Sequence, residues 1–266
     1  MTFAHAIAER SVILFGLVLF LVQLACFEFG HRIGRRRRER TSGHTESVGL
    51  VVGGMLGLLA FVLALTLSFA NTRFNDRQAG TLAEANAIGT AWLRAKAIGG
   101  PRAETIATLL EQYTPVRADF VRADPEQVEA LAQRTNALQS EMWGHLAALV
   151  HEKPDPVSSA LMAALNDAFD ASTKERFAYF LHVPPQMFWL LVVMAVVSIA
   201  CLGYQLGLRD NAPRVLIVVL TLMWTVVIVN ILDLASARIG YLRAGTAAYE
   251  WTLQGFKGGL TIPALR

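Results

Sequence analysis

The sequence predicts an all-α polytopic membrane protein in which two transmembrane helical hairpins flank an extramembrane helical bundle. The 266 residues are 54% hydrophobic, and their mean hydropathy of +0.41 is too high for an ordinary soluble domain. Four apolar runs are each long enough to cross a hydrocarbon core of about 30 Å. The charged residues lie in blocks between these runs. Four regions follow: a first hairpin (1–70), a helical domain (71–185), a second hairpin (186–237) and an amphipathic C-terminal tail (238–266).

The first hairpin consists of two apolar runs, from Ser11 to Phe29 and from Val48 to Phe69. A cleaved signal peptide is the alternative interpretation of the first run. The basic cluster follows that run instead of preceding it, and no A-x-A cleavage site is present, so a retained span is favoured. We expect the segment from Gly30 to Ser47 to be a short loop, and it holds six arginines: Arg32, Arg35, Arg36, Arg37, Arg38 and Arg40.

The second hairpin consists of runs from about Gln186 to Leu208 and from Arg214 to Leu234. Prolines begin both helices, where the missing N–H costs nothing because the first turn has no acceptor for it. These prolines are Pro184, Pro185 and Pro213, and the turn between the runs contains Arg209, Asp210 and Asn211.

Orientation is predicted from the short loops, because Lys and Arg resist translocation while long domains escape this rule. The first loop carries six arginines. The segment from Asn71 to Pro185 carries eleven Lys or Arg and fourteen Asp or Glu. We therefore expect both hairpin tips in the cytoplasm, with the middle domain in the periplasm and both termini outside.

The middle domain is predicted to be helical throughout. The second span should continue as one helix to Ile98, where Gly99, Gly100 and Pro101 stop it. A helix over 102–122 carries an apolar stripe, and Asp124-Pro125 and Asp155-Pro156 each predict an N-cap followed by a first turn. The last helix is expected to bury Leu161, Leu165, Phe169 and Phe177 on one face.

Small residues form a stripe along the second span at spacings of three or four, and therefore on one face. In lipid such a face lets helices pack closely, as in GxxxG pairs. Alternatively it lines a pore, where small side chains leave room and hydroxyls meet an ion. Both interpretations require assembly of helices, and the candidate residues are Gly49, Gly53, Gly57, Ala60, Ala64 and Ser68.

Polar groups within the apolar runs are functional candidates because they are costly in a bilayer. Gln23 is in the middle of the first span, and Asn230 and Asp233 lie near the end of the fourth. A salt bridge or helix cap at the membrane surface is one explanation for the latter two, and ion coordination is the other. At the end of the first span, Glu28 and Arg32 have the spacing of a helical ion pair.

The sequence offers little evidence for nucleic-acid binding, metal binding or catalysis. The run from Arg35 to Arg38 is explained by topology, or by contact with anionic lipid, instead of by nucleic acid. The histidines are scattered, and Cys26 and Cys201 lie in apolar runs, so no metal site is predicted. Phosphate-binding and nucleophile motifs are missing from the sequence. We therefore predict neither a cofactor nor enzymatic activity.

One segment has the character of a family motif, from Glu84 to Arg94, and its candidate residues are Glu84, Asn86, Gly89, Thr90 and Arg94. Asn86 and Gly89 are poor helix formers, so either close packing or a specific function requires them. Together with Arg73-Phe74 and Leu202-Gly203-Tyr204-Gln205, this segment resembles a bacterial membrane-protein family of unknown function that is labelled bestrophin-like. The resemblance extends from about Val48 to Asp233.

The resemblance implies the two-hairpin plan and a homo-oligomeric ion channel whose second transmembrane helices surround the pore. Lipid, further copies of the chain and inorganic ions are the partners implied. The chain departs from the family pattern after Asp233-Leu234, where Ala235-Ser236-Ala237 replaces Asp-Arg-Pro. It also departs in orientation, because bestrophins keep the middle domain in the cytosol. A non-conducting scaffold or sensor, whose helical domain binds a partner, is the alternative function.

Overall fold

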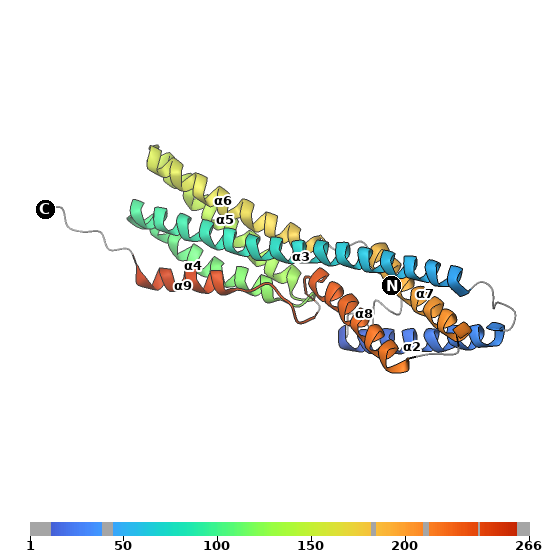
Figure 1. The fold of residues 1–266 in the computed structure, drawn as a ribbon. Helices are drawn as coiled ribbons and strands as arrows, with labels where there is room; N and C mark the ends of the chain where they lie inside the picture. The colour runs from blue at the N-terminus through green and yellow to red at the C-terminus, as the bar shows by residue number, and fades with distance from the viewer. Residues whose placement is uncertain (1–11, 39–44, 182–184, 210–212, 239, 260–266) are drawn as a thin grey trace. The chain divides into compact units, whose positions relative to one another are not determined.

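The computed structural model describes residues 12–38, 45–181, 185–209, 213–238 and 240–259, and within these ranges the regular structure is helical. The chain forms two compact units. Unit 1 comprises residues 1–73 and 182–242, and unit 2 comprises residues 74–181 and 243–266. Figure 1 labels the helices. The sequence-based expectation of an all-α fold is confirmed.

Unit 1 contains the four helices that are long and apolar enough to span a membrane among the described residues. They are α2 (Val12–Arg37), the first part of α3 (Thr45–Ile98), α7 (Pro185–Arg209) and α8 (Arg214–Ala235). Their shared core includes Phe15, Leu63, Leu191 and Ile228, one from each helix. Helices are therefore present at the four predicted spans, and α7 and α8 begin and end close to the expected positions.

Helices α2 and α7 pack along a seam of four glycines, Gly30, Gly34, Gly203 and Gly207. A Cβ built on Gly30 would lie 2.1 Å from the carbonyl oxygen of Ala200, and one on Gly203 would lie 2.2 Å from that of Phe27. Glycine is thus required on both helices, because only the missing side chains let the two backbones meet.

The predicted loop between the first two spans is wrong in extent, because α2 continues past Gly30 to Arg37. Two physical reasons explain the longer helix. Gly30 and Gly34 serve the seam with α7 and do not end the helix. Arginine is a good helix former, and its charge is favourable at a helix C-terminus.

Unit 2 packs the second part of α3 with α4 (Gly100–Arg122), α5 (Val128–Glu152), α6 (Pro156–Phe180) and α9 (Ala247–Gly258). As expected, α3 is one uninterrupted helix that ends at Ile98, and Gly99 and Gly100 follow with φ of 66° and 82°. The predicted cap of α6 is also confirmed, because the carboxylate of Asp155 accepts the backbone N–H of Ser158 at 2.7 Å.

Two local expectations in unit 2 are wrong. Helix α5 begins at Val128 with Gln127 as its N-cap, because residues after Asp124 form a separate turn first. Phe177 is 62% exposed, since α6 buries the face that carries Leu165, Ser172 and Glu175 instead. A few residues used in the predictions lie outside the described ranges: Ser11, Arg40, Pro184, Asp210 and Asn211.

Candidate functional site

The small-residue stripe of α3 lies on a face that the described part of the chain leaves uncovered. Its core-facing side carries Val52, Leu59 and Leu63. A Cβ built on Gly53 or Gly57 would meet no atom within 4 Å. Gly49 is half-buried beside Gln205, and the other five members of the stripe are exposed: Gly53, Gly57, Ala60, Ala64 and Ser68.

The second candidate feature is a buried charge cluster in unit 2, built around Arg117 of α4. Its guanidinium Nε donates to Glu84 Oε1 at 2.5 Å, and its Nη2 donates to Glu84 Oε2 at 3.0 Å. The same Nη2 also donates to Glu175 Oε2 on α6 at 3.0 Å. Both carboxyl groups are 0% exposed and Arg117 is 2% exposed, so water contributes little to their solvation.

Helix α9 completes this cluster through Tyr249, which is fully buried. The tyrosine Oη lies 2.8 Å from Glu84 Oε2 and 2.9 Å from Glu175 Oε2. On α3, Thr81 Oγ1 lies 2.7 Å from the other oxygen of Glu175. Glu84, Arg117, Glu175 and Tyr249, together with Thr81, are called the carboxyl cluster below. Four helices therefore meet at one dry polar site.

Burial and the neighbouring charges set the protonation of the cluster. Burial raises the pKa of Glu175 to about 8, and the hydrogen bond and negative charge of Glu84 act in the same direction. Burial alone lowers the pKa of Arg117, but attraction by Glu84 more than offsets it, so Arg117 stays a cation. Burial, followed by the carboxyl charges, raises the pKa of Tyr249 well above its usual value. At neutral pH one cation therefore faces one anion and one neutral acid.

Residues of the family motif have different positions around this cluster. Glu84 is in the cluster, and Gly89 lies beneath α9, where a Cβ would lie 3.8 Å from Thr252 Cγ2. Arg94 donates to the carbonyl oxygen of Ala160 on α6 at 2.6 Å. Asn86 and Thr90 are exposed. The motif thus contributes one side chain to the cluster and a second position to the contact with α9.

The predicted intramembrane polar residues do not gather at one site. Gln23 is buried, and its Nε2 donates to Thr225 Oγ1 on α8 at 3.1 Å. Asn230 donates to the carbonyl oxygen of Val226 on its own helix. The Asp233 carboxylate accepts the backbone N–H groups of Tyr241 and Leu242 at 2.9 and 3.3 Å, so it stabilises the segment that follows α8.

The side chains of Arg35, Arg36, Arg37 and Arg38 are exposed at the end of α2. One turn earlier, Arg32 pairs with Glu28 at 3.0 Å, as their spacing predicts.

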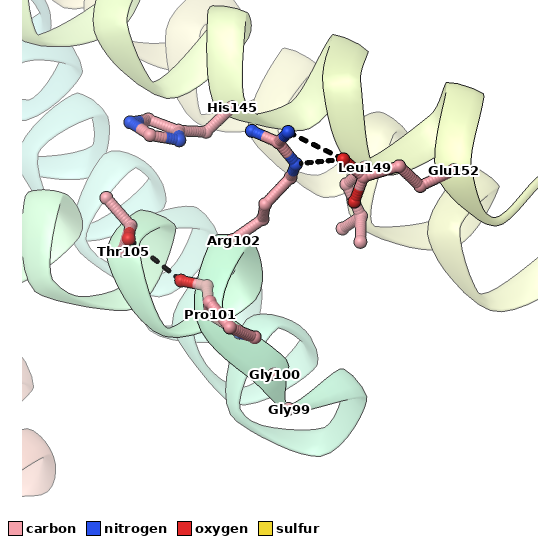
Figure 2. Close-up of a pocket in the computed structure, with 8 residues that line it drawn as sticks. All are labelled: Gly99, Gly100, Pro101, Arg102, Thr105, His145, Leu149 and Glu152. Carbon is pink, nitrogen blue, oxygen red and sulfur yellow. Dashed lines mark hydrogen bonds and ion pairs between the residues drawn. The ribbon is translucent and has the colours of Figure 1, made fainter.

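An open pocket of about 420 Å³ lies at the start of α4, where Figure 2 shows Arg102, His145 and Glu152 around it. Arg102 is already paired with Glu152 at 2.6 Å, and both side chains are more than one-third exposed. The charge of Arg102 is therefore largely compensated, and this pocket offers weak recognition of a charged ligand.

Sequence reasoning did not identify Arg117, Glu175 or Tyr249 as candidate residues. A signal was available for two of them, because helical spacing places each on the apolar face of its helix. Arg117 comes one turn after the buried Tyr113 and one turn before the buried Phe120. A charged residue at such a position needs a buried partner of opposite sign. Tyr249 carried no comparable signal.

Four apolar spans joined to a second helical unit with a dry charge cluster define a polytopic helical membrane protein. A family model described as a bestrophin-like domain matches residues 17–240, which is most of the chain. The chain therefore belongs to the bestrophin-like family, as its motif segment predicts. No curated protein and no solved structure matched the chain.

Proposed function

We propose that the chain is a subunit of a homo-oligomeric ion channel in the bacterial inner membrane, with the small-residue stripe of α3 lining the pore. The observation that supports this proposal is the uncovered position of the stripe. Gly53, Gly57 and Ala60 are exposed within an apolar span although one chain has three other spans available to cover them. A further copy of the chain is the partner that such a face needs.

Comparison with α8 supports this assignment, because a helix face in contact with lipid carries large apolar side chains. On α8 the exposed residues include Val215, Leu222 and Met223. On α3 large exposed residues such as Leu58 and Phe69 lie on the face next to the stripe. Within α3, lipid is therefore expected on the bulky face, and the channel axis on the small one.

The same face of α3 stays uncharged after the apolar run ends. Successive exposed positions at helical spacing are Asn71, Asn75, Ala79, Leu82 and Asn86. Amide side chains offer both donors and acceptors to a passing ion, without a fixed charge that would trap it. This pattern is consistent with a permeation path that continues along α3 beyond the lipid.

Reconstitution into planar bilayers tests the proposal. We expect ionic conductance from the wild-type protein, and a strong reduction in Gly53→Leu and Ala60→Leu because the added side chains narrow the pore. Val193→Leu is the matched control, since Val193 is exposed on α7. Conductance that is absent, or equal in all four proteins, contradicts a pore at this face.

A non-conducting scaffold or sensor is the second candidate, favoured by the way the polar groups within the spans are used. Gln23 and Asn230 bond to groups on α8, and neither residue is on the stripe. Disulfide crosslinking through Ala60→Cys separates the candidates. Oligomers that crosslink in high yield through position 60 but do not conduct ions would support the scaffold, because the α3 helices of neighbouring copies are then packed together at this face.

We also propose that the arginine-rich end of α2 is cytoplasmic and unit 2 periplasmic. The supporting observation is the charge distribution, because a short basic segment is retained in the cytoplasm. In intact cells, Gln112→Cys on the exposed side of α4, next to Glu111, should react with a membrane-impermeant maleimide, and Arg36→Cys should not. The reverse pattern of labelling reverses the assigned orientation.

A further inference from the structure

We propose that α9 is a proton-dependent strap, held to unit 2 by a proton that Glu175 contributes to the carboxyl cluster, and loosened when Glu175 ionises. This inference concerns the C-terminal helix and does not depend on ion conduction. Figure 1 shows α9 beside α4, and both belong to unit 2.

The proposal follows from the hydrogen-bond geometry of the cluster, in which two hydroxyl groups have more acceptors beside them than protons to donate. The hydroxyl of Tyr249 has short contacts with Glu84 and Glu175, at 2.8 and 2.9 Å. The hydroxyl of Thr81 has short contacts with the Arg77 carbonyl oxygen and with Glu175, at 3.0 and 2.7 Å. Each hydroxyl has one proton to donate but two acceptors beside it. The two hydroxyl protons can therefore fill only two of these four contacts. A protonated Glu175 supplies a third donor, and on Oε2, the oxygen that faces Tyr249, its proton bonds the tyrosine hydroxyl.

Ionisation of Glu175 would therefore remove a hydrogen bond and add a second buried anion. The groups that face it are Glu84 and Thr81 from α3, Arg117 from α4 and Tyr249 from α9. Arg77, which is also buried, lies one turn before Thr81 on the same side of α3. Burial and Glu84 raise the pKa of Glu175 to about 8, although the positive charge of Arg117 acts in the opposite direction.

Tyr249 provides the only fully buried side chain of α9 among the described residues, so the cluster is the centre of its attachment. Around the cluster, Thr252 donates to the Ala85 carbonyl oxygen at 3.3 Å, and Phe256 contacts the ring of Trp92. The ion pair between Arg122 and Glu250 is more than half exposed, and such pairs contribute little. These outer contacts of α9 are therefore too weak to hold the helix in place without the hydrogen bonds of Tyr249.

The direction of the pH effect follows from the raised pKa. When α9 lifts away, water reaches Glu175 and its pKa falls toward the ordinary glutamate value of about 4.5. The docked state then binds a proton more tightly than the undocked state. Docking is strongest at acidic pH and weakens as the pH rises to about 8, the pKa in the docked state.

Hydrogen exchange of the full chain in detergent micelles tests the strap. Labelling times at pH 6 and pH 9 are scaled to equal chemical exchange, and peptides from α8 serve as the internal reference. We expect protection of the α9 amides to fall about ten-fold or more between these pH values, since one pH unit of linked ionisation is a ten-fold change. Glu175→Gln, which stays neutral, should retain α9 protection at both pH values.

Tyr249→Phe removes only the hydroxyl and should lower α9 protection at pH 6 toward the level of the wild type at pH 9. Its matched control is Tyr241→Phe, because Tyr241 is 75% exposed. Equal protection of wild-type α9 at pH 6 and 9 overturns the proposal. So does a wild-type pH response in Glu175→Gln, or full protection in Tyr249→Phe. Loss of conductance without any of these results would concern the channel proposal alone.

Discussion

Unit 1 and unit 2 bring their helices together by opposite means. In unit 1, α2 and α7 meet where four side chains are missing, and the backbone of Gly30 lies against the Ala200 carbonyl group. In unit 2, the helices meet around large polar side chains, with Arg117 and Tyr249 among the bulkiest fully buried residues. Unit 1 is therefore expected to be sensitive to added atoms. Unit 2 is expected to be sensitive to removed ones.

The largest predicted effect is the loss of the arginine in unit 2. Arg117→Met should destabilise unit 2 by about 3–5 kcal/mol, because it leaves Glu84 as a buried anion without its cation. Chemical unfolding in detergent, followed through the exchange of α4 and α6 amides, measures the change. Arg102→Met is the control, since the Arg102–Glu152 pair is exposed and should contribute little to stability. Equal effects of the two variants would show that Arg117 does not stabilise unit 2 through Glu84.

The second prediction adds one methyl group to unit 1. Gly203→Ala should destabilise unit 1 by about 1–3 kcal/mol, because its Cβ would lie 2.2 Å from the Phe27 carbonyl oxygen and the helices must separate. Gly53→Ala should change stability by less than about 1 kcal/mol, since its Cβ has open space and alanine favours a helix. Thermal unfolding in detergent compares them. Similar melting temperatures would mean that the seam between α2 and α7 tolerates a wider spacing.

Sequence patterns predicted the elements whose signals are local. Four apolar runs gave four spans, and Gly99-Gly100-Pro101 correctly predicted the end of α3. The glycine seam was harder to predict. Gly30 and Gly203 lie far apart in sequence, and a glycine after an apolar run is also typical of a loop. A glycine that packs against another helix can be distinguished from a glycine in a turn only when the partner helix is known, and the local sequence does not identify that helix.

The third prediction concerns the pH dependence of unit 2. The pKa of Glu175 is about 8 in the folded state, against an ordinary glutamate value of about 4.5. Its stabilising effect is therefore complete below about 4.5 and is lost as the pH rises to about 8. The slope should approach 1.4 kcal/mol per pH unit for this one group. Denaturant unfolding of wild type and Glu175→Gln between pH 5 and 9 measures it. Parallel curves for the two proteins would contradict the assignment.

The smallest predicted effect contrasts the two Asp-Pro sequences. Asp155→Ala should cost about 1 kcal/mol, because its carboxylate caps α6 through Ser158. Asp124→Ala should cost less than about 0.5 kcal/mol, since the Asp124 carboxylate makes an exposed pair with Arg243 instead of a helix cap. Thermal unfolding measures both. An equal loss would show that Asp124 does cap a helix in solution.

These two sequences also show why the carboxyl cluster could be predicted only in part. Asp155-Pro156 and Asp124-Pro125 carry the same local signal, yet only the first caps a helix. Glu84 was found because it belongs to a recognisable motif. Its partners Arg117, Glu175 and Tyr249 come from three other helices, and their convergence depends on how those helices pack.

The pairing of helices in unit 1 has a consequence for biosynthesis. Gln23 on α2 contacts Thr225 on α8, a residue 202 positions later. At about 5–20 residues per second, a ribosome needs about 10–40 seconds to make the chain between them. The backbone at Gly30 and Gly34 packs against α7 at Ala200 and Tyr204. For most of that interval α2 therefore waits in the lipid with this backbone uncovered. A chaperone or a neighbouring nascent chain would find there a transient docking place that the finished protein no longer offers.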